Sequence, residues 1–406
     1  MIFKKKFISS VLCLSLLIGN VTYAHADSSK VVTIGADLTS TQKQTVLDYF
    51  GVKENEAVIL EVNNLEERKY LQGIASEAQL GTRTFSCAYV EPAKKGNGIN
   101  VKTANLTYVT SSMIASTLAT CGIEDANVIA MTPLKGGVSG TGALTGVMKA
   151  FEDATGQELN EEKKELASEE LITTSDLGDE IGQDAATGII NDIKADVIKN
   201  GTQDVTQIAE TINNITNNYN ITLTPEQEEQ VSNLMTKISK QNYNYDTLKN
   251  TFKNVSDSVT ENLKSAGINI KRSEGFFASI GNWFKDLFSG NKDLGILENT
   301  NDNILGDDVK VDATDDNAIK DTAAEGFWSK FKTFISNLFN SSDESQPTES
   351  QNTSNTNNST SNSETTSIDE HTTTTESNDN TDTNSQNINK SEEENLQNSE
   401  NNNSES

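Results

Sequence analysis

The segment 341–406 limits most strongly what this chain of 406 residues can fold into. It consists mainly of Ser, Thr, Asn, Gln and acidic residues, and it contains no Phe, Trp or Tyr. Such a segment cannot bury enough apolar surface to offset the entropy lost on ordering, so we predict a disordered acidic tail. It carries 14 Asp or Glu against the single Lys390, which accounts for much of the formal net charge of −28. A hydrophobic core must therefore come from the residues before this tail.

The first 26 residues have the three parts of a secretory signal peptide. Lys4, Lys5 and Lys6 form a positive start, an apolar run covers residues 7–18, and residues 24–26 (Ala-His-Ala) have the small-x-small pattern that signal peptidase cleaves. The apolar run is too short to span a bilayer alone. We therefore predict an exported product that begins at residue 27 and is secreted or associated with the cell envelope.

Charge, histidine and cysteine usage argue against several classes of function. An acidic mature chain does not suit nucleic acid, whose binding is dominated by Lys and Arg contacts to phosphate, or simple electrostatic attachment to anionic lipid. The two histidines are His25, in the signal peptide, and His371, in the tail. The folding region therefore offers no histidine for nucleophilic catalysis or metal ligation, and no cofactor is indicated. Without Cys13, the chain keeps Cys87 and Cys121, which the sequence leaves open as a disulfide or as two separate buried thiols.

Residues 27–155 alternate between strand and helix patterns. This alternation predicts an α/β-like domain with a mixed sheet of about five strands covered by helices. A turn at 94–98 is expected to join the third and fourth strands as a hairpin. Helices are expected to begin after the N-caps Thr39 and Asn64, and at Ser111. The expected strands cover residues 31–34, 57–62, 83–90, 98–108 and 126–131.

Residues 156–268 carry apolar residues at helical spacing, which predicts an α-helical bundle packed on or beside the sheet domain. Ile208, Ile212 and Ile215 form one apolar face, and Thr224-Pro225 is a strong helix start. The fold class expected for the whole chain is therefore α+β. The expected helices cover residues 158–172, 184–199 and 205–219, a segment beginning at 225, and residues 246–266.

Four ordered motifs resemble a known family. They are residues 32–39 (VTIGADLT), 50–52 (FGV), 64–73 (NLEERKYLQG) and 137–146 (GVSGTGALTG). Together they are similar to the secreted YpuA-like family, catalogued as domain of unknown function 1002 and found mainly in Gram-positive bacteria. The resemblance covers residues 31–267. It implies a secreted protein of unknown activity and supplies no catalytic residues.

The Gly-rich segment 135–146 could present backbone N–H groups to an anion, but its glycine spacing matches neither a phosphate loop nor a nucleophile elbow. Gly142, Gly146 and Ala150 fall on one side of the expected helix, so we expect them to allow close packing on the sheet. An alternative is an enzyme without histidine, of the Ser/Lys hydrolase type, in which Ser139 pairs with a nearby lysine. The two candidate lysines are Lys135 and Lys149.

Scattered acidic residues leave a third alternative, a secreted protein that binds a divalent cation. Their spacing is not that of an EF-hand. One group is Asp176, Asp179 and Asp184, and a weaker group is Asp302, Asp307, Asp308 and Asp312.

The clearest positional signal is a repeated aromatic segment. Residues 274–277 (EGFF) and 325–328 (EGFW) open two copies that are offset by 51 residues. Seven apolar positions in each copy form one stripe of an amphipathic helix, so we predict short helices within 269–290 and 324–340, separated by an acidic linker at 291–323. The stripes consist of Phe276, Phe277, Ile280, Trp283, Phe284, Leu287 and Phe288 in the first copy, and of Phe327, Trp328, Phe331, Phe334, Ile335, Leu338 and Phe339 in the second.

Both tryptophans of the chain lie in these two aromatic segments. Trp and Phe on an otherwise polar helix suit insertion into a membrane interface or into the groove of a partner protein. Packing of the two helices on the bundle or on each other is the plainer alternative. The interpretation we favour is a non-catalytic, envelope-associated or partner-binding protein that docks through these helices.

Overall fold

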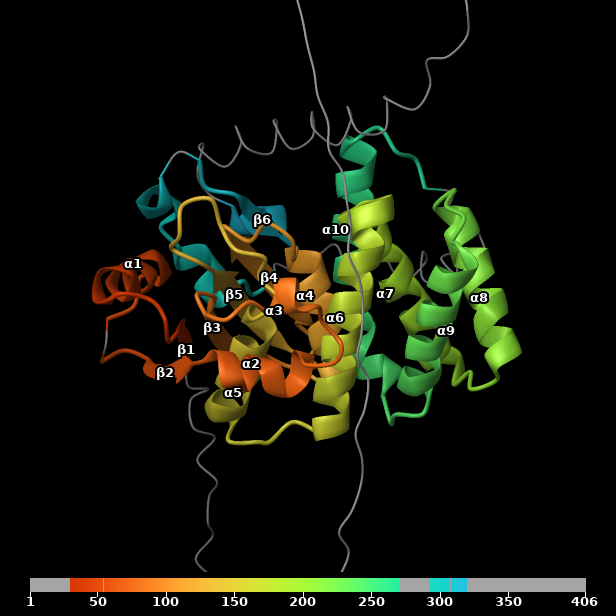
Figure 1. Cartoon of the computed structure of the whole chain (residues 1–406), viewed down its shortest axis with the longest axis horizontal. Helices are drawn as coiled ribbons and strands as arrows, with labels where there is room; N and C mark the ends of the chain where they lie inside the picture. Colours follow the sequence, from red (N-terminus) through yellow and green to blue (C-terminus); the bar gives the residue numbers. More distant parts are fainter. Residues whose placement is uncertain (1–29, 54, 271–291, 307, 320–406) are drawn as a thin grey trace, which may run out of the picture. The chain divides into compact units, whose positions relative to one another are not determined.

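A computed structural model describes residues 30–53, 55–270, 292–306 and 308–319 (Figure 1). The predicted signal peptide, both aromatic segments and the acidic tail lie outside the described residues. Among the described helices, none has an apolar stretch long enough to cross a bilayer.

A six-stranded mixed sheet forms the centre of the fold, with the order β2-β1-β3-β5-β4-β6. β1 and β2 are parallel, β4 and β5 are parallel, and β3 and β6 run antiparallel to their neighbours. Together with the helices described below, this sheet confirms the predicted α+β class. The strands are β1 (Val31–Gly35), β2 (Val58–Val62), β3 (Cys87–Pro92), β4 (Ile99–Ala104), β5 (Ala126–Met131) and β6 (Val311–Ala313).

The predicted hairpin between the third and fourth strands is wrong. The turn between them exists, with positive φ at Gly96 and Gly98, but β5 lies between β3 and β4 and pairs with both. All six residues of β5 are buried, as are all six of β4, which suits strands that are paired on both sides. A local turn signal shows where the chain reverses and does not determine which strands pair.

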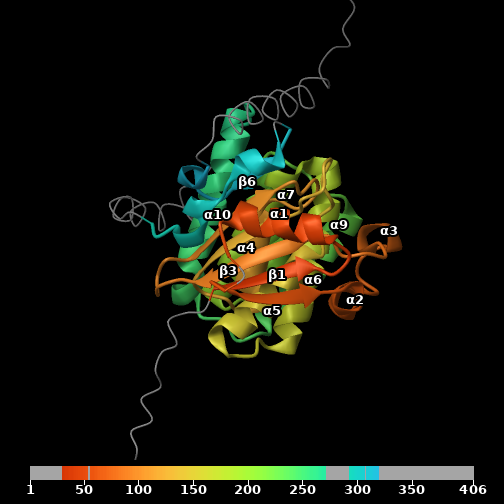
Figure 2. The same cartoon turned by 90° about the vertical axis from the view of Figure 1, so that its left-hand side faces the viewer.

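Ten α-helices are present in the described part of the chain, and they cover the sheet unequally. α4 and α5 lie on one face, while α1 lies on the other (Figure 2). The N-terminal caps at Thr39 and Thr224 form as predicted. The helices are α1 (Ser40–Phe50), α2 (Asn64–Leu71), α3 (Glu77–Leu80), α4 (Ser111–Cys121), α5 (Ala143–Thr155), α6 (Glu161–Ile181), α7 (Gln183–Asn200), α8 (Val205–Asn218), α9 (Pro225–Ser239) and α10 (Tyr245–Ser265).

The helical region packs directly on the sheet through α4. Every residue of α4 is buried, because the sheet lies on one side of it and α6, α7 and α10 lie on the other. A single apolar cluster consequently runs from Val31 in β1 through Ile114 in α4 to Leu234 in α9. The bundle therefore covers the sheet domain and shares its core.

Residues 292–319, which we call the strap, correct the predicted acidic linker at 291–323. The described residues of this segment form three short 3₁₀ helices and the strand β6. β6 pairs with β4, with Lys102 opposite Ala313 and Ala104 opposite Val311. Acidic residues are interspersed among the apolar ones in this segment, so the sequence pattern did not indicate which positions belong to the core. The buried apolar residues of the strap include Leu294, Ile296, Leu297, Leu305, Val309 and Val311.

Candidate functional site

The carboxyl ends of the four parallel strands lie at one edge of the sheet. Helices α1, α2, α4 and α5 begin beside that edge, after the loops that leave β1, β2, β4 and β5. Ligands of α/β sheets commonly bind at such an edge. The Gly-rich segment 135–146 lies in the loop after β5 and at the start of α5, so it belongs to this edge.

Glu67 is the buried acidic residue of this edge. Its side chain is 4 % exposed, and its carboxylate lies against Gly142, so close that any Cβ on Gly142 would overlap it. Burial raises the pKa of Glu67 to about 7, hydrogen bonds from Thr84 and Asn64 oppose this shift, and the charge of Asp37 adds to it. Because Gly142 provides no side-chain cap for α5, the Glu67 carboxylate stands where an N-terminal cap or an anion would otherwise lie.

Close packing of α5 on the sheet is confirmed. A Cβ on Gly146 would lie 2.8 Å from Oγ1 of Thr33 in β1, and Ala150 is fully buried one turn further on. Gly142 packs instead against Glu67 of α2. The predicted close approach to the sheet therefore holds for Gly146, whereas Gly142 allows a close approach of Glu67 instead.

The Ser/Lys pair is not assembled at this edge. Oγ of Ser139 lies 3.3 Å from Oγ1 of Thr141, and among the described residues no hydrogen bond joins Ser139 to a lysine. Nζ of Lys149 binds the Glu61 carbonyl oxygen at 2.6 Å and Oε1 of Glu66. Lys135 is exposed on the turn after β5. The alternative of a hydrolase at Ser139 gains no support from this geometry.

The predicted cation ligands are separated by the fold. In the described ranges, no group of three or more Asp, Glu, His or Cys residues could hold a metal ion. Asp176 and Asp179 both accept hydrogen bonds from the Tyr108 hydroxyl, whereas Asp184 accepts one from Asn262. Within the second predicted group, Asp302 pairs with Lys102, Asp312 accepts the backbone N–H of Ser111, and Asp307 lies outside the described residues.

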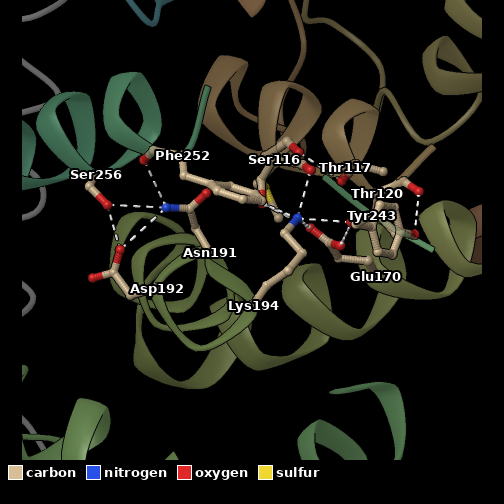
Figure 3. Close-up of polar contacts among 11 residues, drawn as sticks. Ser116, Thr117, Thr120, Glu170, Asn191, Asp192, Lys194, Tyr243, Phe252 and Ser256 are labelled. Carbon is tan, nitrogen blue, oxygen red and sulfur yellow. Dashed lines mark hydrogen bonds and ion pairs between the residues drawn. The ribbon is translucent and has the colours of Figure 1, made fainter. Parts of the chain in front are cut away.

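A fully buried ion pair lies between α4, α6 and α7 (Figure 3). Nζ of Lys194 is 2.6 Å from Oε1 of Glu170, 2.9 Å from Oγ of Ser116 and 2.9 Å from Oγ1 of Thr120. The carboxylate of Glu170 also accepts hydrogen bonds from both hydroxyls. Burial lowers the pKa of Lys194, and the charge of Glu170 opposes that shift.

This cluster has the residue types of a Ser/Lys nucleophile site, but it is closed. Ser116, Thr120, Glu170 and Lys194 are all at most 2 % exposed, so no substrate reaches them. The cluster fixes the relative positions of α4, α6 and α7, since its buried polar atoms find their hydrogen-bond partners in this arrangement of the helices. The sequence did not indicate this ion pair. The one hint was Lys194, a lysine that stands among apolar residues in α7.

A second set of polar contacts continues along α7 (Figure 3). Asp192 accepts the hydroxyl of Tyr219 at 2.8 Å and a hydrogen bond from Ser256. Nδ2 of Asn191 donates to the carbonyl oxygen of Phe252 at 3.0 Å. α7 is therefore tied to α10 and to the end of α8 by buried hydrogen bonds.

The two cysteines are free, buried thiols. Cys87 belongs to the apolar cluster that contains α1, and Cys121 belongs to the cluster that contains α4 and the bundle. Burial raises the pKa of each thiol to about 12. Of the two alternatives left open by the sequence, the structure has separate thiols.

The two ends of the strap meet. Nζ of Lys292 lies 3.1 Å from Oδ2 of Asp315. Lys292 follows the first aromatic segment directly, and Asp315 precedes the second. The strap thus brings Lys292, which follows the first aromatic segment, next to Asp315, which lies four positions before the last described residue ahead of the second.

The fold and these sites define an α+β protein with buried polar clusters, in which the described residues do not bring Ser139 into contact with a lysine. The chain belongs to the family described as "Protein of unknown function (DUF1002)", whose family model matches residues 34–255. It is 37 % identical over 279 residues to "Uncharacterized protein YpuA" of Bacillus subtilis (strain 168), and this match covers 68 % of the present chain and 95 % of the relative. No solved structure matches the chain significantly.

Proposed function

We propose that this protein is exported and acts without catalysis, as an envelope-associated or partner-binding protein that docks through its two aromatic segments. The observation that carries the proposal is the ion pair between Lys292 and Asp315. This contact supports the proposal because it joins a residue that follows the first segment to one that precedes the second, although the aromatic copies are 51 residues apart in the sequence.

Chain length then limits how far each segment can lie from its attachment point. Phe288 precedes Lys292 by 4 positions, and Phe327 follows Asp315 by 12 positions. At about 3.6 Å per extended residue, these connections reach at most about 14 Å and about 43 Å. Both aromatic copies can therefore engage the same surface at once.

Two linked copies bind more strongly than either alone. When one segment has inserted, the second binds at an effective concentration set by the short connection, which raises the overall affinity by about 10²- to 10⁴-fold. Each copy presents seven apolar residues with few charges nearby. Binding should therefore be mainly hydrophobic and only weakly dependent on salt.

Co-sedimentation of the mature protein, residues 27–406, with liposomes and with purified cell envelopes tests this proposal. Phe284→Asp and Phe331→Asp each place a charge in the middle of one apolar stripe. We expect each single variant to lose at least about tenfold in affinity, since bivalency is lost, and the double variant to remain in the supernatant. Val205→Asp is the matched control, because Val205 is an apolar residue that is 56 % exposed on α8.

Comparison of sedimentation among the unmodified protein and its variants decides whether the proposal holds. Docking through both segments requires that Val205→Asp sediments like the unmodified protein. If the unmodified protein itself stays in the supernatant with liposomes and with envelopes, the proposal fails. It also fails if the double variant sediments as well as the unmodified protein.

A further inference from the structure

The turn between β3 and β4 contains Asn97 and Gly98, and it holds the start of the strap. Nδ2 of Asn97 donates to the carbonyl oxygen of Asp293 at 3.0 Å, and Oδ1 of Asn97 accepts the backbone N–H of Asp293 at 3.2 Å. Nδ2 also lies 3.4 Å from Oδ1 of Asn127 in β5. A single amide side chain therefore fixes the strap at Asp293 through both its donor and its acceptor.

The pair Asn97-Gly98 is also a chemically reactive sequence. The backbone nitrogen after an asparagine can attack the side-chain amide and close a five-membered succinimide ring. Glycine favours this attack, because it has no Cβ to obstruct the approach and its backbone is conformationally free. The chain contains this dipeptide twice, at Asn97-Gly98 and at Asn200-Gly201.

The surroundings of Asn97 supply the groups that ring closure needs. The backbone N–H of Gly98 must lose its proton before the nitrogen attacks, and it donates to Oδ1 of Asp125 at 2.7 Å. A carboxylate within hydrogen-bond reach of that proton is positioned as a general base. The N–H of Asp293 polarises the amide carbonyl of Asn97 and stabilises the charge that develops on its oxygen.

The second Asn-Gly pair has a different environment, which makes it an internal reference. The N–H of Gly201 donates to the carbonyl oxygens of Ile198 and Val197 at the end of α7. These oxygens cap the helix and do not act as bases at neutral pH. Asn200 is nevertheless more exposed than Asn97, so access to water alone favours reaction at Asn200.

We propose that Asn97 is a self-modifying site, at which the Asp125 carboxylate promotes conversion of the asparagine to aspartate or isoaspartate. Asp125 takes the proton of the Gly98 N–H, the Gly98 nitrogen bonds to Cγ of Asn97, and the bond from Cγ to Nδ2 breaks. Nδ2 receives the proton from Asp125 and leaves as ammonia. Water then adds to one of the two carbonyl groups of the succinimide, which gives aspartate or isoaspartate.

The product loses the contacts that fix the start of the strap. A carboxylate at position 97 has no donor for the carbonyl oxygen of Asp293, and it faces Oδ1 of Asn127, which is a second acceptor. Isoaspartate also lengthens the main chain by one carbon just before β4. Conversion should therefore loosen residues 292–295, whereas the ion pair between Lys102 and Asp302 still holds the later part of the strap.

Incubation of the folded mature protein at neutral pH, followed by peptide mapping with mass spectrometry, measures conversion at both asparagines. We expect Asn97 to convert faster than Asn200. Asp125→Asn keeps an acceptor oxygen and removes the base, so it should slow conversion at Asn97 at least about tenfold. Glu124→Gln, at the exposed neighbouring residue, is the matched control and should leave this rate unchanged.

In urea, Asp125 is no longer held beside Gly98, so Asp125→Asn should convert at the same rate as the unmodified protein. The proposal is overturned if the folded protein converts Asn97 no faster than Asn200. It is also overturned if folded Asp125→Asn converts at the unmodified rate.

Hydrogen exchange of Asn97→Asp, which reproduces one product, measures the effect on the strap. We expect protection of residues 292–295 to fall at least about tenfold relative to the unmodified protein, and protection of residues 300–305 to change much less. Equal protection of residues 292–295 in the two proteins would show that conversion does not loosen the strap.

Discussion

Nζ of Lys102 lies 2.8 Å from Oδ2 of Asp302, although 200 positions separate the two residues and both side chains are at most 2 % exposed. Lys102 belongs to β4 and Asp302 to the strap, so this pair makes a segment of acidic, low-hydropathy sequence part of the core. Neither residue is stable in the interior without the other, because an isolated buried charge is strongly unfavourable. The strap therefore belongs to the folded unit.

Replacement of Lys102 by Met should destabilise the protein by about 3 to 5 kcal/mol, because it leaves the Asp302 carboxylate buried without its cation. Urea unfolding followed by circular dichroism measures this loss. Lys53→Met is the control, since Lys53 is 81 % exposed in its pair with Glu56 and should contribute under about 1 kcal/mol. Equal stabilities of the two variants would show that the ion pair between Lys102 and Asp302 does not hold the strap.

Lys194→Met should likewise lower the free energy of unfolding by about 3 to 5 kcal/mol, because Glu170 is left charged in the core. Adding Glu170→Leu should recover most of this loss, since both charges are then absent. The pair Lys237 and Glu169, whose lysine is 54 % exposed, provides the control cycle with a coupling below about 1 kcal/mol. Additive losses at Lys194 and Glu170 would contradict the direct ion pair.

Gly146→Ala should destabilise the protein by about 1 to 3 kcal/mol, because the new methyl group would lie 2.8 Å from Oγ1 of Thr33. Thr33→Ala removes that oxygen, which is buried and has no hydrogen-bond partner among the described residues, so the double variant should regain stability. Thermal unfolding of both single variants and the double variant gives the coupling. If Thr33→Ala fails to relieve the Gly146→Ala loss, α5 does not pack on β1 at this point.

Stability should fall as pH rises from about 4.5 to about 7 and then stay level, in part because of Glu67. Its pKa is raised to about 7 in the folded state, so the folded protein binds the proton more tightly than the unfolded chain does. The contribution to the free energy of unfolding is on the order of 2 to 3 kcal/mol. Urea unfolding at pH 5 and pH 8 measures the slope, and Glu67→Gln should reduce it. Glu61→Gln, at an exposed residue of β2, is the control, and an identical slope in Glu67→Gln would refute this assignment.

Neither cysteine of the mature protein should react with a thiol reagent under native conditions. Both thiols are buried, and burial raises the pKa of each to about 12, so the reactive thiolate is scarce. In denaturant without reductant, both should react and add two labels to the intact mass. Labelling in denaturant that appears only after reduction would instead show a disulfide between Cys87 and Cys121.

The sequence predicted the elements that depend on local interactions. Caps at Thr39 and Thr224, and the small residues Gly146 and Ala150 on one side of α5, follow from spacing alone. The α+β class followed from the change of apolar period along the chain. These features were accessible because each is determined by residues within a few positions of one another.

Pairings between distant segments were not accessible from the sequence. The insertion of β5 between β3 and β4 depends on the packing of the whole core, and the local turn between β3 and β4 did not indicate it. The partner of Lys102 lies 200 positions away in a segment whose composition predicts a loose linker. Asp184 and Asp312, which the sequence places in two separate acidic groups, bind partners in α10 and at the start of α4, respectively.

The sequence by itself determined most of the helices, the strands before the strap, the close packing at Gly146 and the repeated aromatic pattern, because the period and the capping of a short segment are local properties. Only the tertiary structure decided the strand order, the burial of Lys102 and Lys194, and the meeting of Lys292 with Asp315. A buried charge is stable where a partner from another element reaches it, and that partner is selected by the packing of the whole core.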